Sequence, residues 1–244
     1  MTSALLPICV LSNLLLALAS PAPAQDPEPK KPTPKRMVVK QLSGFTVHVD
    51  PALLEGPHSK TGAHALRMLE NHLERISLLV QGDRLGQLRQ ARIWVEHEHP
   101  KLRTMQYHVS KNWLIKNGHD PRLAKMVHIP RARDLVSRAQ IIKHPAVVLH
   151  ELAHAFHDQQ LGFNDPRIRE AYEAAKAKGN YEKVLAHNGQ TVKHYALTNR
   201  MEYFAEATEA YFYRNDFYPF VRAELEKHDP KMHALLVEIW GPAR

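Results

Sequence analysis

Pro145-Ala-Val-Val-Leu-His150-Glu151-Leu-Ala-His154-Ala-Phe-His-Asp158 is the stretch around which the rest of the chain can be organised. It predicts a helix, because Pro145 suits a first turn and no helix-breaking residue follows before Gly162. Residues four apart on a helix lie on one face, so His150 and His154 can direct two imidazole rings at one point. This is the spacing of two ligands on Zn²⁺, and Glu151 is placed to act as general base on a water activated by the metal.

A simpler interpretation is a chance match, because the sequence contains 17 His among 244 residues. A helix can carry polar histidines on an outer face without any metal. The flanking residues favour a buried helix, since apolar side chains surround it on nearly all sides: Val147, Val148, Leu149, Leu152, Ala153 and Phe156. Histidines and a glutamate inside such a helix need partners to offset their desolvation, which favours the metal interpretation.

A catalytic zinc site normally has three protein ligands, so a third must come from elsewhere. The extended pattern His-Glu-x-x-His-x-x-Gly-x-x-His is excluded, because His157 occupies the Gly position and Gln160 the last His position. His157 is then expected on the helix surface or beside the ligands. Asp158 could orient a ligand histidine from outside or be an ordinary solvated residue.

The best candidate for the third ligand lies in Tyr195-Ala-Leu-Thr-Asn-Arg-Met-Glu202-Tyr-Phe-Ala-Glu206. Glu202 and Glu206 share one face of a predicted helix, with Glu202 as ligand and Glu206 supporting a ligand histidine. Two other interpretations stay open. Asn199 and Glu202 also fit a capping box, and Glu206 and Glu209 could simply be solvated.

The two motifs together resemble the lethal factor-like family of gluzincin-type zinc metallopeptidases, over roughly residues 145–212. The resemblance implies a zincin-like fold, Zn²⁺ as cofactor and a protein or peptide as substrate. It also implies a catalytic role for Tyr195, which stands seven residues before Glu202 as a site tyrosine does in that family. Such a tyrosine can donate a hydrogen bond to the developing oxyanion.

The order of predicted elements indicates an α+β fold of zincin-like type. A small mixed twisted sheet is expected in the N-terminal half, the active-site helix at the junction and a mostly helical C-terminal half. Strands are predicted within Val38–Val49 (a hairpin turning at Gly44), Ala91–His97, Met105–Val109 and Lys125–Ile129. Helices are predicted at Thr61–Val80, Arg131–Ile142, Pro166–Lys178, Asn199–Tyr213, 219–228 and 230–239. Lys125–Ile129 is expected to be an open sheet edge that pairs with an extended peptide.

The first 36 residues differ in composition from the rest. Residues 1–24 resemble a signal peptide, with the apolar run Leu14–Ala19 and the small-x-small site Ala22-Pro-Ala24, although no Lys or Arg precedes the run. An uncleaved anchor is the alternative, but the run is short for a membrane span. Residues 25–36 form a Pro-rich linker, and 37–244 the expected catalytic domain. The only cysteine, Cys9, lies in the signal, so the exported chain would have no disulfide.

The sequence therefore predicts a zinc-dependent endopeptidase, secreted or periplasmic, with no stable membrane insertion after cleavage. Its net charge of +8 is interpreted as a solvated surface, since no nucleic-acid module accompanies the scattered basic residues. Two alternatives remain: a non-catalytic secreted zinc-binding module of the same fold, and a basic surface protein acting on anionic polymers. The oligomeric state and the particular substrate are left open.

Overall fold

The computed structural model describes residues 35–242. The chain enters a hairpin of β1 (Val38–Leu42) and β2 (Phe45–Val49), which turns at Ser43 and Gly44, both with positive φ. β3 (Arg92–Val95), β4 (Gln106–Tyr107) and β5 (Met126–Ile129) complete a five-stranded sheet in the order β1-β2-β3-β5-β4. The pairs β2–β3 and β3–β5 are parallel, whereas β1 and β4 are antiparallel to their neighbours. The sheet is therefore mixed, as expected.

One face of this sheet carries the main hydrophobic core. Alternation along the strands sends Val47, Ile93 and Val127 into that core, together with residues of α1 (Ser59–Leu79) and α5 (Val147–Phe156). The other face has a small separate cluster around Trp94 and Met126, partly covered by α3 (Lys111–Lys116). The two faces thus have different neighbours, and only one of them supports α5.

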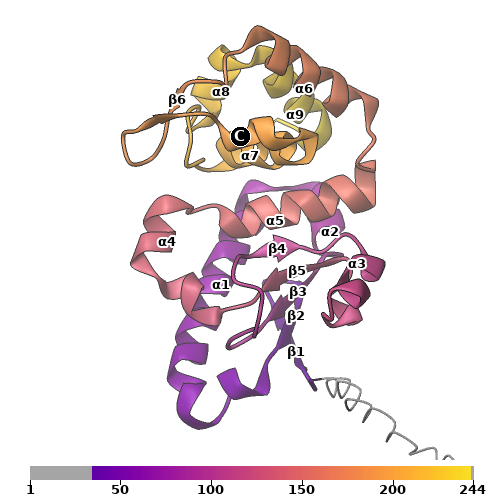
Figure 1. Ribbon diagram of the computed structural model, residues 1–244, viewed down its shortest axis with the longest axis vertical. Helices are drawn as coiled ribbons and strands as arrows, with labels where there is room; N and C mark the ends of the chain where they lie inside the picture. Colours follow the sequence, from indigo (N-terminus) through magenta and orange to yellow (C-terminus); the bar gives the residue numbers. More distant parts are fainter. Residues whose placement is uncertain (1–34, 243–244) are drawn as a thin grey trace, which may run out of the picture. The chain divides into compact units, whose positions relative to one another are not determined.

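The predicted edge strand is wrong. Met126–Ile129 lies between β3 and β4, and all four of its residues are buried. A continuous apolar run such as this is typical of a central strand with both faces covered. The free edge on that side belongs instead to the two-residue strand β4, which lies next to α5 (Figure 1).

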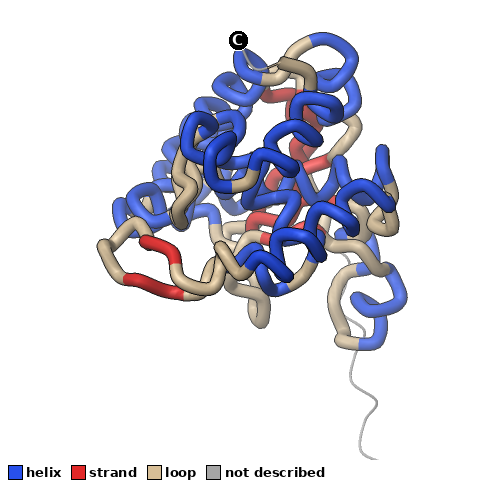
Figure 2. Tube along the Cα trace, turned by 90° about the horizontal axis from the view of Figure 1, so that it is seen from above, coloured by secondary structure: helices blue, strands red, loops and turns tan. Residues whose placement is uncertain are grey.

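The chain after α5 is mostly helical. α6 (Pro166–Lys178), α7 (Arg200–Phe212), α8 (Arg222–His228) and α9 (Pro230–Trp240) stand on the side of α5 away from the sheet in Figure 1. A hairpin of β6 (Val184–Leu185) and β7 (Thr191–Val192) extends beside them. Figure 2, which looks from above, shows these helices lying over the strands. The predicted α+β organisation, with the motif helix at the junction, is confirmed.

Smaller features differ from the predictions. The single helix expected at Arg131–Ile142 is divided into a 3₁₀ turn (Ala132–Val136) and α4 (Arg138–Lys143), because extended Ser137 interrupts it and caps α4. A short α2 (Gly82–Leu88) follows α1. The predicted signal peptide and linker residues 25–34 lie outside the described residues. Within the described part, no helix is both long and apolar enough to cross a membrane.

Candidate active site

Helix α5 presents the two histidines of the motif on one face. Almost the whole helix is buried between the sheet on one side and the C-terminal helices on the other. His150 and Glu151 are only 4% and 7% exposed. His154 follows one turn later and is part-buried. The His150 and His154 rings meet at an interplanar angle of 84°, and their Nε2 atoms are 3.1 Å apart. The helical spacing therefore does what the sequence indicated: it converges two imidazoles.

Helix α7 brings Glu202 to the same point. Asn199 caps this helix, since its side-chain oxygen accepts hydrogen bonds from the backbone N–H groups of Met201 and Glu202. Of the capping-box interpretation, the part that concerns Asn199 is thus confirmed. The Glu202 side chain does not complete a capping box, because its Oε2 lies 3.1 Å from Nε2 of both His150 and His154.

These three donor atoms fit a zinc ion. Nitrogen and oxygen ligands about 2.0–2.1 Å from a tetrahedral Zn²⁺ lie about 3.3 Å from one another, close to the 3.1 Å observed for each pair. Both ligand types are ones that zinc prefers. Burial would raise the pKa of Glu202, but hydrogen bonds to the two histidines hold it well below its usual range. The carboxylate is therefore charged and available as a ligand.

A second carboxylate, that of Glu209, holds the ring of His150 at Nδ1, the nitrogen that faces away from the three donor atoms. Glu209 Oε1 accepts hydrogen bonds from His150 Nδ1 at 2.6 Å and from His144 Nε2 at 3.0 Å. Such a bond selects the tautomer that leaves Nε2 free for a metal. Burial opposes charge on Glu209, yet His144 and His150 lower its pKa to about 2, and Glu209 raises the pKa of His144 to about 9.

Glu206, the predicted partner of a ligand histidine, lies farther away, with Oε1 3.6 Å from His150 Nδ1. Glu206 and Glu209 are both buried, so the solvated alternative is wrong for each. Burial, and then the charge of Glu209, raise the pKa of Glu206 to about 8. The sequence did contain a signal for Glu209, because residues 202, 206 and 209 follow the i, i+4, i+7 positions of one helix face.

Glu151 and Tyr195 line the same cleft as the three donor atoms. The cleft has a volume of about 540 Å³ and is bounded by β4, α4, α5 and α7. Glu151 Oε2 accepts a hydrogen bond of 2.8 Å from the backbone N–H of Tyr107 in β4. Tyr195, 47% exposed, stands at the cleft with a pKa raised by burial and by Glu202, so its hydroxyl remains a donor.

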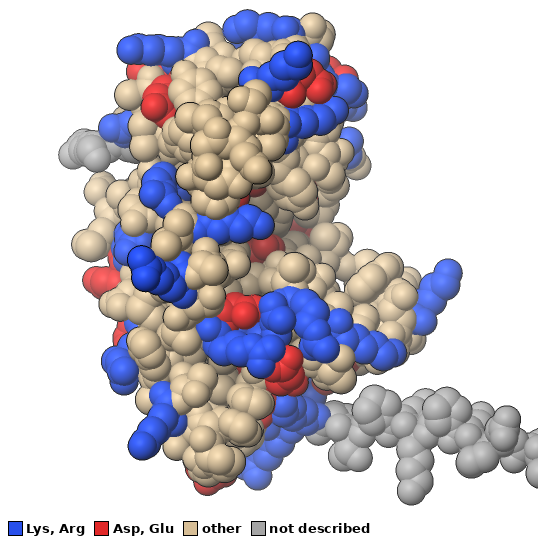
Figure 3. Space-filling view, turned by 60° about the vertical axis from the view of Figure 1, so that its left-hand side comes forward, with Lys and Arg blue, Asp and Glu red and all other residues tan. Residues whose placement is uncertain are grey.

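Figure 3 shows this cleft as a hollow between the upper and lower parts of the molecule. Carboxylate side chains lie inside the hollow, and Lys and Arg side chains gather along its margins. Arg103, Arg131 and Lys143 are the basic residues that line it. The three residues that carry the donor atoms, His150, His154 and Glu202, line this open hollow.

Two further residues of the motif helix are not part of the cluster. His157 is fully buried, so the helix surface, one of the two places expected for it, is wrong, and its ring packs on Phe163 and Phe204. Asp158 neither orients a ligand histidine nor stands in solvent. It pairs with Lys125 and accepts a hydrogen bond of 2.7 Å from the Tyr107 hydroxyl.

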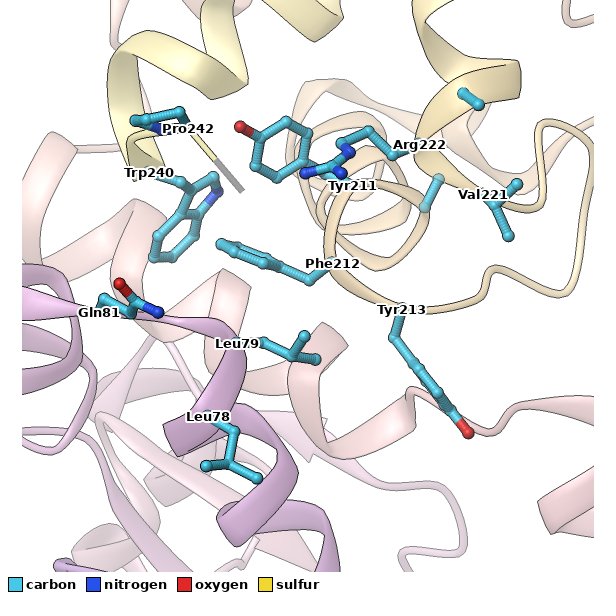
Figure 4. Close-up of a pocket in the computed structure, with 12 residues that line it drawn as sticks. Leu78, Leu79, Gln81, Tyr211, Phe212, Tyr213, Val221, Arg222, Trp240 and Pro242 are labelled. Carbon is cyan, nitrogen blue, oxygen red and sulfur yellow. The ribbon is translucent and has the colours of Figure 1, made fainter. Parts of the chain in front are cut away.

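Another cavity, of about 310 Å³, lies between the end of α1 and the ends of α7 and α9 (Figure 4). Four aromatic side chains contribute to its wall, with Arg222 over the ring of Tyr211. It is lined by Leu78, Leu79, Gln81, Ala210, Tyr211, Phe212, Tyr213, Val221, Arg222, Ala223, Trp240 and Pro242. These residues include no histidine or carboxylate, so this cavity is not a competing metal centre.

One known protein family matches the part of the chain that contains this site. No curated protein matches the sequence. The structure is similar to that of the Pro-Pro endopeptidase PPEP-2 from Paenibacillus alvei, with 18% identity over 79% of this chain and 95% of that chain and a TM-score of 0.45. The family described as anthrax toxin lethal factor, N- and C-terminal domain, matches residues 98–239, more than half of the sequence and the whole of the site. The chain belongs to this family.

Proposed function

We propose that this protein is an exported zinc-dependent endopeptidase that hydrolyses peptide bonds. In this proposal His150, His154 and Glu202 hold the metal. Glu151 is the general base, and Tyr195 donates a hydrogen bond to the substrate's carbonyl oxygen. The observation that carries it is the triangle of donor atoms, each 3.1 Å from the others, beside a carboxylate in an open cleft of a lethal factor family member.

A Zn²⁺ ion held there would supply an acidified water and polarise a carbonyl oxygen. Glu151 would take the proton of the attacking water and pass it to the leaving amine, so that one water is consumed per peptide bond broken. Its Oε2 is held by the N–H of Tyr107, which leaves the other carboxylate oxygen for the water. The Tyr195 hydroxyl would donate a hydrogen bond to the carbonyl oxygen as negative charge develops on it.

The edge of β4 is the natural place for an extended substrate. His108 directs its backbone N–H and C=O towards Met126 and Lys125, and Tyr107 directs its N–H the opposite way, towards Glu151. A peptide that added a strand on this free edge would lie beside the general base. The edge role predicted for Lys125–Ile129 therefore passes to β4.

The main alternative is a non-catalytic zinc-binding module. A structural zinc site is normally closed by four protein ligands, and His157 or Asp158 would have to be the fourth. Among the described residues, the candidate metal group around His154 comprises three side chains, and both of these residues point to other partners. This supports the catalytic interpretation.

Replacing Glu151 by Gln tests the proposal directly. We expect the purified variant to bind one zinc ion, as the unchanged chain does, while hydrolysis of unfolded casein falls by at least about a thousandfold, since an activating base is lost. The matched control is Glu226→Gln, at an exposed position of α8. Chelator should abolish activity in the control and added zinc should restore it. Undiminished hydrolysis by Glu151→Gln would contradict the mechanism, and absence of zinc would contradict the metal site.

Export is tested separately. If residues 1–24 are a cleaved signal, mass spectrometry of the exported protein should find Gln25 at its N-terminus. A chain that retains Met1 and sediments with membranes would favour the uncleaved anchor.

A further inference from the structure

A hollow lies on the face of the sheet that is turned away from α1 and α5. Its volume is about 500 Å³, within the range of pockets that bind small molecules. Strands β2, β3 and β5 contribute its floor, while α3 and the turn before β5 contribute one wall. It is lined by Arg36, Met37, His48, Arg92, Trp94, Lys111, Pro121, Arg122, Ala124 and Met126. It shares no residue with the active-site cleft.

The charges around this hollow have one sign. Four of its lining residues are Lys or Arg, and none is Asp or Glu. Arg122 is compensated, because it forms hydrogen bonds with Asp120 outside the hollow, at distances from 2.6 to 3.1 Å. Within residues 35–242, Arg36, Arg92 and Lys111 have no ion-pair partner. Three uncompensated cations of different elements therefore surround one cavity, where they repel each other unless an anion binds.

The floor adds a polar group without a partner. His48 stacks on Trp94 with ring centroids 5.7 Å apart, and the Arg122 guanidinium lies 5.0 Å from the centre of the Trp94 ring. Nε2 of His48 is buried and has no hydrogen-bond partner among the described residues. Burial lowers the pKa of His48, as do the charges of Arg92 and Arg122. The ring is thus neutral at pH 7, and a proton on Nε2 would be available to an oxygen acceptor.

We propose that this hollow is a binding site for a small phosphorylated molecule. A phosphate monoester carries close to two negative charges and three strong acceptor oxygens at pH 7, so it compensates the three cations better than one carboxylate does. Arginine suits this role because its planar guanidinium can give two parallel hydrogen bonds to phosphate oxygens. The apolar side chains of Met37, Pro121 and Met126 would contact the organic part.

The test is calorimetric titration of the full chain with glucose 6-phosphate, inorganic phosphate and glucose at low salt. We expect both phosphates to bind and glucose to give no heat. The double variant Arg92→Gln/Lys111→Gln should weaken glucose 6-phosphate binding by about tenfold or more, because two charge-assisted contacts are lost. Both residues are exposed and unpaired, so circular dichroism of the variant should match that of the unchanged chain.

The matched control is Lys178→Gln/Lys227→Gln, which removes the same charge from exposed positions of α6 and α8. It should bind glucose 6-phosphate within about twofold of the unchanged chain, since distant surface charges are screened. Equal weakening in both double variants would overturn the proposal in favour of general surface charge. So would the absence of phosphate binding to the unchanged chain. Association with phosphatidylglycerol vesicles without any response to glucose 6-phosphate would overturn it in favour of a membrane-facing surface.

Discussion

At the scale of single residues, Glu209 makes the shortest hydrogen bond to a proposed zinc ligand. Its carboxylate lies 2.6 Å from His150 Nδ1, whereas that of Glu206 lies 3.6 Å away. We therefore expect Glu209→Gln to weaken zinc binding by about 10- to 100-fold, and Glu206→Gln, four residues from Glu202 on the same helix, to weaken it less. Competition with a chromophoric chelator measures both. The reverse order would return the supporting role to Glu206, as the sequence indicated.

His157 shows the cost of a buried ring without partners. Neither of its nitrogen atoms has a hydrogen-bond partner among the described residues, and burial lowers its pKa to about 4. The unfolded chain takes up this proton below about pH 6.5 and the folded chain does not, so stability falls as pH falls between those values. The loss from this residue alone is about 3 kcal/mol over that interval.

His157→Leu should remove this loss. We expect it to raise the melting temperature of zinc-free protein at pH 7 by about 2–4 °C, since an apolar side chain has no unmet hydrogen bonds. It should also flatten the decline of stability between pH 6.5 and 4. Urea unfolding across that range measures the difference, with His64→Leu, at an exposed position of α1, as the control. Parallel pH profiles for His157→Leu and the unchanged chain would show that the ring has partners after all.

At the scale of elements, local patterns predicted most helices and strands, because their signals are short in range. Gly44 lies in the turn of the hairpin, and Gly179 ends α6 in the left-handed conformation. The helix of His150 is buried by apolar side chains on nearly all sides, as predicted. The order of the strands in the sheet was not predictable in this way. The strand prediction for Lys125–Ile129 is confirmed by β5, but its edge position is wrong, because the two neighbouring strands come from segments that no local pattern joins to it.

The site was predictable to the same degree. Helical spacing predicted that His150 and His154 converge, and the segment from Tyr195 to Glu206 indicated Glu202 as their partner. The roles of His144 and of the Tyr107 backbone were not visible, because each depends on a contact between distant segments. The hydrogen bond between Glu209 and His150 was likewise not predictable, because it forms only where α7 packs against α5.

The cap of α7 offers a test at this scale. Asn199→Ala should lower the free energy of unfolding by about 1 kcal/mol, because two backbone N–H groups lose their acceptor. It should also weaken zinc binding, since the first turn of α7 positions Glu202. Ser110→Ala, which removes the cap of α3, should cost similar stability and leave zinc binding unchanged. Equal effects of both variants on zinc would contradict a positioning role for the α7 cap.

At the scale of the whole molecule, neutral buried histidines are spread through both halves. His99, His108, His157 and His194 are each less than 9% exposed, and burial lowers their pKa values to about 4, 3, 4 and 3. Burial also lowers the pKa of the half-buried His72 to about 4, so between pH 6.5 and 4 the unfolded chain binds more protons than the folded one at five positions. Glu206 opposes them, because its pKa of about 8 keeps it protonated in the folded chain, so the net excess is about four protons.

This excess makes acid strongly destabilising. Each proton contributes about 1.4 kcal/mol per pH unit, so most of a typical stability of about 5–15 kcal/mol should be lost between pH 6 and 4. We expect the urea midpoint of the zinc-free protein to fall steeply over that interval. Calorimetric unfolding at pH 5.5 in two buffers of different ionisation enthalpy should report an uptake of roughly four protons. A midpoint that stayed constant down to pH 4 would mean that these rings are protonated inside the folded protein, and hence that each has an acceptor.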